Sequence, residues 1–142
     1  MTKYPTLLMA WLMLLLAGCS TNLMTLTPLP TAATMTSDDN GKTITVAVGS
    51  PITVTLAANP TTGYQWTVPT LQDTRVVKFV SSSYAGPSSP AMGAGGTATF
   101  VFQAAGTGIS AVRLVYARPF APQDHPSYFA FTVVVKTPPK RE

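Results

Sequence analysis

Short runs of alternating apolar and polar residues, each closed by proline or glycine, dominate the chain from Gly41 onward. In the run 43–48, for example, Ile44, Val46 and Val48 all fall on one side of an extended backbone. A period of two is typical of a β-strand with one buried face. The expected strands lie at 43–48, 52–56, 64–68, 74–84, 97–104, 109–116 and 128–136. These about seven short strands, with no helical period between them, predict an all-β antiparallel sandwich or barrel.

The composition agrees with this fold class and excludes some functions. Thirteen prolines and ten glycines in 142 residues argue against long helices, while the length suffices for one domain with a full core. The formal net charge of +4 includes Lys3, which belongs to a segment that we expect to be removed, so the mature chain would carry +3. The other basic residues are scattered and form no stripe, so nucleic-acid binding is disfavoured.

The first residues are typical of an export signal. Leu7–Leu16 is apolar throughout but shorter than the roughly 20 residues of a membrane-spanning helix, and it fits the hydrophobic region of a secretory signal. The run ends in Leu16-Ala17-Gly18-Cys19, which resembles the bacterial lipoprotein signal, or lipobox. That resemblance implies a signal peptide over 1–18, cleavage before Cys19, and lipid attachment to Cys19. A plain secretory signal with a chance cysteine is the alternative.

The lipobox resemblance has consequences for location and chemistry. The protein would be anchored in the cell envelope by its lipid, and in the outer membrane of a Gram-negative cell, because Ser20 rather than aspartate follows the cysteine. Cys19 is the only cysteine, so no disulfide can form within the chain and packing alone must hold the domain. Residues 19–40 are rich in Thr, Pro, Ser and Ala and are predicted to form a flexible tether. The folded domain is expected over 41–142.

Catalytic and metal chemistry find little support. The one histidine, His125, follows Asp124 in a proline-bounded loop, and no free thiol or Gly-x-Ser-x-Gly turn is present to serve as a nucleophile. The acidic residues do not cluster with His125, so we expect no metal site and no cofactor. His125 is predicted to be structural or solvent-exposed.

The most distinctive stretch is a loop between two expected strands, at residues 59–64. Pro60 fixes its own φ and keeps Asn59 extended, and Gly63 can take the positive φ of a sharp turn. The stiff side chains of Thr61 and Thr62 lie between these two constraints. Tyr64 and Trp66 follow with a spacing of two, so both can lean to one side and anchor the base of the loop.

Two other loops are unusual. One contains Gly93-Ala94-Gly95-Gly96, whose glycines allow a close approach of the backbone to another surface. The other contains Arg118-Pro119-Phe120, a rigid turn with the residue types that are enriched at interface hot spots. In a sandwich of this strand order, the three loops can emerge at one end.

Taken together and in this order, Asn59-Pro60-Thr61-Thr62-Gly63-Tyr64, Gly93–Gly96 and Arg118-Pro119-Phe120 resemble the three signature loops of the chagasin family. The resemblance covers about Gly41 to Lys136. It implies an immunoglobulin-like fold and reversible, competitive inhibition of papain-like cysteine peptidases by a monomer. All thirteen residues would contact the peptidase, with Thr61 nearest its catalytic cysteine. Phe120 stands where the family often has tryptophan.

Two other functions remain open from the sequence. A lipid-anchored sandwich for adhesion or envelope assembly would explain the lipobox and the strands, but not the three loops together. A small hydrolase ranks below it, because the chain offers no convincing nucleophile.

Overall fold

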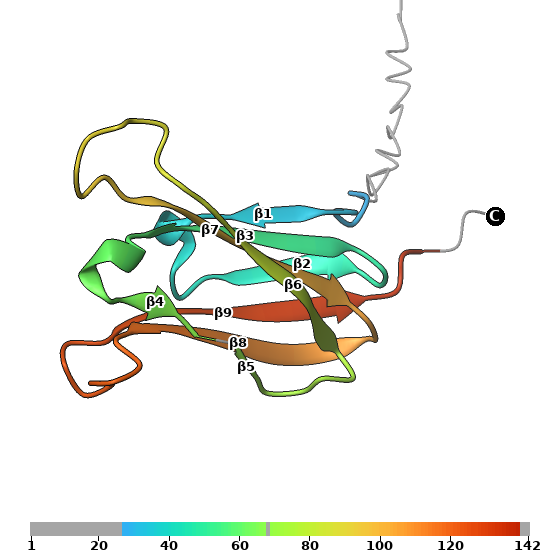
Figure 1. Ribbon diagram of the computed structural model, residues 1–142. Helices are drawn as coiled ribbons and strands as arrows, with labels where there is room; N and C mark the ends of the chain where they lie inside the picture. The colour runs from blue at the N-terminus through green and yellow to red at the C-terminus, as the bar shows by residue number, and fades with distance from the viewer. Residues whose placement is uncertain (1–26, 68, 140–142) are drawn as a thin grey trace, which may run out of the picture.

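Two β-sheets packed face to face make up the computed structural model, which describes residues 27–67 and 69–139 (Figure 1). The strands are β1 (Ala33–Met35), β2 (Thr43–Ala47), β3 (Pro51–Ala58), β4 (Gln65–Trp66), β5 (Thr70–Leu71), β6 (Val77–Ala85), β7 (Gly96–Ala104), β8 (Gly108–Ala117) and β9 (Ser127–Lys136). Single 3-10 turns occur at η1 (Ser37–Asp39) and η2 (Pro60–Thr62). Within the described ranges no helix is long and apolar enough to cross a membrane. The all-β sandwich predicted from the sequence is confirmed.

The strand order determines which strands lie at the edges of each sheet. One sheet has the order β1-β3-β7-β6, and the other has the order β2-β9-β8-β4, with β5 also paired to β8. The expectation of a purely antiparallel sandwich is wrong at two pairs, because β1 runs parallel to β3 and β2 parallel to β9. The remaining pairs are antiparallel. Both parallel pairs involve an edge strand from the N-terminal part of the fold.

The core lies between the inner faces of the two sheets and follows the alternation seen in the sequence. Ile52, Val54 and Leu56 of β3 are buried, as are Phe129, Phe131, Val133 and Val135 of β9. Phe102 of β7 is fully buried and meets the rings of Phe79 and Phe131 at centroid distances of 5.7 and 6.0 Å. Burying one such side chain stabilises the fold by about 1.5–3 kcal/mol, so the aromatic cluster holds both sheets together without a disulfide.

The fold begins earlier than the sequence indicated. The prediction of a tether over 19–40 is wrong from Ala33 onward, since Ala33–Met35 pairs with Ile52–Val54 and Met35 is buried in the core. A three-residue edge strand is too short to show a period of two, which explains the error. The predicted lipidation site, Cys19, and the predicted signal peptide over 1–18 lie outside the described residues.

The described chain starts and ends at the same end of the sandwich. The carbonyl oxygen of Pro30 accepts hydrogen bonds from the Ala47 amide (3.1 Å) and the Ser50 hydroxyl (3.3 Å). The carbonyl oxygen of Lys136 accepts one from the Val48 amide (3.0 Å). Both termini of the described part therefore adjoin the turn 47–50, from which β3 runs to the opposite end of the molecule (Figure 1).

Candidate functional site

The three unusual loops of the sequence gather at the end of the sandwich that lies opposite the turn 47–50 (Figure 1). We define loop 1 as residues 59–64, loop 2 as residues 86–95, and loop 3 as residues 118–126. They follow β3, β6 and β8, respectively. β3 and β6 are each antiparallel to β7 and therefore run in the same direction. The expectation that the three loops emerge at one end is confirmed.

Loop 1 is a closed turn rather than an open connection. Asn59 is extended (φ −136°, ψ 85°), Pro60–Thr62 form the single 3-10 turn η2, and Gly63 ends the turn with φ +81°. The Asn59 carbonyl oxygen accepts hydrogen bonds from the Thr62 amide (3.2 Å) and the Thr62 hydroxyl (2.7 Å). The Thr61 hydroxyl donates to Oδ1 of Asn59. Both threonines are exposed, so loop 1 presents them in a fixed shape.

Aromatic rings support loop 1 from below. Tyr116 of β8 packs between Tyr64 and Trp66, at centroid distances of 5.5 and 5.0 Å. Its hydroxyl accepts a hydrogen bond from the Asn59 amide (2.8 Å), and the Trp66 indole donates to the Ala57 carbonyl (3.0 Å). The predicted anchoring role of Tyr64 and Trp66 is confirmed. Tyr64 is half-buried and lies beneath the loop tips rather than among them.

Loop 2 is attached to the start of loop 1. Nδ2 of Asn59 donates a hydrogen bond to the Gly93 carbonyl (2.9 Å). A Cβ atom at Gly95 would lie 3.2 Å from the Ala58 carbonyl oxygen and 3.6 Å from Cβ of Asn59, so the backbone of loop 2 packs directly on loop 1. Gly96 already belongs to β7, where Tyr84 and Ala85 leave no room for a side chain. The pairing of β6 with β7 therefore requires a glycine at position 96.

Loop 3 is attached to the end of loop 1. Nε of Arg118 donates to the Thr62 carbonyl (3.3 Å), and its guanidinium carbon lies 4.6 Å from the centre of the Tyr64 ring. Phe120 packs against Gly63, where an added Cβ would come within 3.3 Å of the ring, yet 78% of Phe120 remains exposed. Pro119 lies exposed between Arg118 and Phe120. Loop 1 thus lies between loop 2 and loop 3 and contacts both.

Asp124 is a structural part of loop 3 that the sequence reasoning missed. Its carboxylate pairs with Nη1 of Arg118 (2.7 Å), and its carbonyl oxygen accepts a hydrogen bond from the Tyr64 hydroxyl (3.0 Å). No local pattern in the sequence links Asp124 to residues 6 and 60 positions away. The neighbouring His125 is exposed over 94% of its side chain, in agreement with its predicted solvent exposure.

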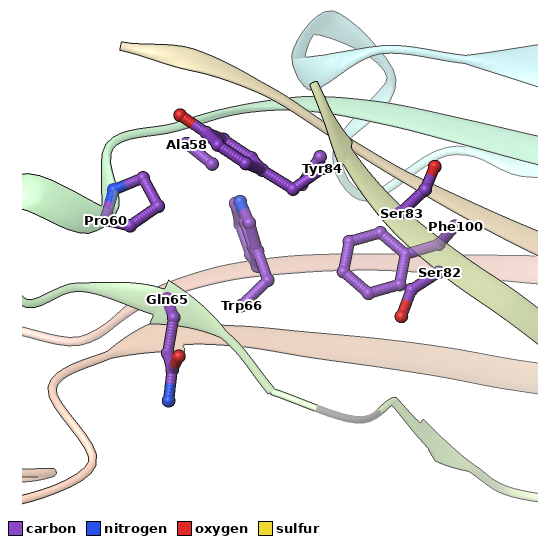
Figure 2. A pocket seen from close by; sticks show the side chains of 9 residues that line it. Ala58, Pro60, Gln65, Trp66, Ser82, Ser83, Tyr84 and Phe100 are labelled. Carbon is purple, nitrogen blue, oxygen red and sulfur yellow. The ribbon is translucent and has the colours of Figure 1, made fainter. Parts of the chain in front are cut away.

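A pocket of about 300 Å³ opens beside loop 1, between the edge strands β4 and β6 (Figure 2). Trp66 and Tyr84 face one another across it, and the ring of the buried Phe100 lies to one side of them. The remaining lining residues are Ala58, Pro60, Gln65, Ser82, Ser83 and Ala98. Loop 1 borders this pocket through Pro60, and its contacts with Tyr116, loop 2 and loop 3 hold its shape beside the opening.

The chemistry of this end is that of a contact surface. Arg118 and Asp124 neutralise one another, and the exposed residues at the tips of loop 1 and loop 3 are uncharged: Pro60, Thr61, Thr62, Pro119 and Phe120. In the part of the chain that the structure describes, no group of three or more His, Cys, Asp or Glu side chains could hold a metal ion. Exposed apolar tips on a rigid framework are typical of sites that bind another protein.

We predict that Gly63→Ala displaces the Phe120 ring. Gly41 is the matched control, because it has nearly the same φ (+80°) but open space around the added Cβ. Both substitutions should cost about 1 kcal/mol of unfolding free energy from the left-handed backbone. Only Gly63→Ala should change the NMR shifts of the Phe120 ring protons. An equal, small shift change in both variants would show that Phe120 does not pack on loop 1.

Comparison with known proteins gives matches over most of the folded part. The family model described as chagasin family peptidase inhibitor I42 matches residues 45–135, a range that includes the predicted contact residues of all three loops. The chain is 39% identical to chagasin of Trypanosoma cruzi over 105 residues, which cover 72% of this chain and 94% of chagasin.

Two solved structures share the fold. One is the cysteine protease inhibitor EhICP2 of Entamoeba histolytica, with a TM-score of 0.66, 20% identity, and coverage of 75% of this chain and 99% of that one. The other is PbICP-C in complex with falcipain-2, with a TM-score of 0.56, 15% identity, and coverage of 76% and 94%. At these identities the likeness concerns the fold, and it confirms the immunoglobulin-like sandwich that the sequence predicted.

Proposed function

This chain belongs to the chagasin family of peptidase inhibitors, and we propose from that premise that its loop end plugs the active-site cleft of its target. The chain is an inhibitor of papain-like cysteine peptidases and not an enzyme. The proposal concerns how it inhibits: loop 1 would enter the cleft, while loop 2 and loop 3 would contact the two walls. The observation that carries it is the position of loop 1 between the other two, with a hydrogen bond to each.

Loop 1 would occlude the catalytic cysteine without serving as a substrate. Thr61, at the exposed tip, would lie nearest the cysteine. The η2 turn curls the backbone of 60–62 away from the extended form in which a peptidase attacks a carbonyl. Because the turn is closed by its own hydrogen bonds, little conformational entropy would be lost on binding. Inhibition should therefore be reversible and competitive.

The two flanking loops would make different kinds of contact. Gly93, Ala94 and Gly95 would approach one wall of the cleft through their backbone, since they carry little or no side chain. Phe120 would pack on apolar or aromatic surface of the other wall, because most of its ring is free. Arg118 would brace loop 3 rather than contact the enzyme, since its guanidinium is already bound to Thr62, Asp124 and the Tyr64 ring. A standard interface of about 1,600 Å² would suffice for tight binding.

We predict that Thr61→Arg abolishes tight inhibition. A long charged side chain at the tip of loop 1 would clash with the cleft, and the inhibition constant against papain should rise at least about 100-fold. Thr107→Arg is the matched control, because Thr107 is exposed in the turn before β8, at the opposite end of the sandwich. The control should inhibit like the wild type. Equal inhibition constants for the two variants would rule loop 1 out of the cleft.

We also propose that a lipid on Cys19 anchors the inhibitor, as a monomer, to the cell envelope, in the outer membrane of a Gram-negative cell. The support is the Leu16-Ala17-Gly18-Cys19 motif after an apolar run. The position of Pro30 at the turn 47–50 is compatible with it, since the chain would approach the sandwich from the end opposite the loops (Figure 1). An inhibitor anchored in this way would present its three loops away from the lipid surface.

We predict that Cys19→Ala releases the protein from membranes without loss of inhibition. Without the thiol no lipid can be attached, and a single cysteine leaves no other site. Detergent phase partition of cell extracts should move the protein from the detergent phase to the aqueous phase. Wild-type protein that partitions into the aqueous phase would contradict a lipid on this residue, whatever its inhibition constant.

A further inference from the structure

We propose that Met92, in loop 2, is an apolar contact residue that sets how tightly the loop end holds its target peptidase. This inference rests on the function proposed above and adds a side chain to a loop whose predicted contacts were those of backbone and small residues. The argument depends on how Met92 is held, what lies beside it, and the chemistry of its side chain.

Met92 occupies the corner of a β-turn. The Ala94 amide donates a hydrogen bond to the Ala91 carbonyl (3.1 Å), which closes the turn 91–94. Gly93 has φ +80°, the value that a type II turn requires at its third position. Met92 therefore stands at the second position of the turn, and the residue is completely exposed, at 103% of its reference area.

The turn is held against loop 1, so Met92 is presented from a fixed base. The residue that follows it, Gly93, accepts the hydrogen bond from Nδ2 of Asn59. Two residues after Gly93, Gly95 packs on the Ala58 carbonyl. Because the backbone beside Met92 is attached to loop 1 at two points, little backbone entropy is lost when a partner covers the side chain.

Met92 and Phe120 lie on the two loops that flank loop 1, Met92 on loop 2 and Phe120 on loop 3. Phe120 reaches the Gly63 end of loop 1, whereas the turn of Met92 is attached at the Asn59 end. The tip at Thr61 is thus flanked on each side by a loop that carries one large exposed apolar side chain. Isolated exposed apolar residues are common and need no explanation, but two of them flanking a binding loop indicate anchors for the walls of one cleft.

Methionine also suits a surface that must fit more than one peptidase. Its side chain is unbranched and polarizable, so it can adapt to different apolar surfaces at little cost. We therefore expect Met92 to contribute to binding several papain-like peptidases rather than to select one of them.

Substitution tests the contact directly. Met92→Ala should raise the inhibition constant against papain about tenfold, as expected for an apolar anchor at an interface. Met92→Leu keeps the apolar volume and should stay within about threefold of the wild type. Ile109→Ala is the matched control, because Ile109 is also an exposed apolar residue (63%) but lies at the start of β8, away from the loops.

Oxidation gives a second readout on the same side chain. Hydrogen peroxide transfers one oxygen atom to Sδ of methionine, which loses two electrons and becomes the sulfoxide, while the peroxide is reduced to water. Residual peroxide is removed with catalase before the peptidase is added. Oxidised wild type should then inhibit as weakly as Met92→Ala, because the sulfoxide is polar, and oxidised Met92→Leu should inhibit as well as before treatment.

The outcomes separate this inference from the function on which it rests. If Met92→Ala and Ile109→Ala inhibit equally well, Met92 does not contact the peptidase and the inference fails. The proposed function would still stand, because both variants inhibit. If oxidation weakens the wild type and Met92→Leu to the same degree, another residue is responsible and the inference fails. If the wild type itself does not inhibit, the function proposed above fails first.

Discussion

Asn59 is the residue on which the arrangement of the loop end depends. Its backbone amide donates to Tyr116, its carbonyl oxygen accepts from both donors of Thr62, its Oδ1 accepts from Thr61, and its Nδ2 reaches Gly93 of loop 2. One side chain and its backbone therefore connect the sheet below, the turn of loop 1 and the neighbouring loop. The asparagine amide suits this position because its acceptor and its donor are separate atoms that reach two partners at once. The carboxylate of aspartate only accepts, the hydroxyl of serine has a single oxygen, and the amide of glutamine lies one carbon farther out.

The connections at Asn59 and Arg118 explain how a small contact surface can bind tightly. Loops that are free in solution must be ordered on binding, and that loss of entropy weakens the complex. Here loop 1 is closed by hydrogen bonds, attached to loop 2 at one end and to loop 3 at the other, and supported by the rings of Tyr64, Trp66 and Tyr116. Most of the ordering is thus completed during folding, and the exposed tips at Thr61, Met92 and Phe120 remain free for the target.

The sequence predicted the sandwich because six of its strands, β2, β3 and β6 to β9, have five residues or more and carry apolar residues toward one face. It predicted the loops because proline, glycine and aromatic residues mark them. It did not predict β1 or β5, which are two or three residues long. Nor did it predict that β1 runs parallel to β3 and β2 parallel to β9, since the alternation within a strand does not specify its partner or its direction. Asp124 and Tyr116 escaped notice for the same reason. Met92 lay one residue before a recognised glycine motif, and only its position at the corner of a turn distinguishes it.

The central claim is that three preset loops act as one plug for a peptidase cleft. A crystal structure of this chain bound to papain tests it most directly. We expect loop 1 inside the cleft with Thr61 nearest the catalytic cysteine, loop 2 and loop 3 on opposite walls, and the hydrogen bonds from Asn59 to Gly93 and from Arg118 to Thr62 unchanged from the free protein. A complex in which the peptidase binds another face of the sandwich, or in which those two hydrogen bonds break to let the loops spread, would contradict the account.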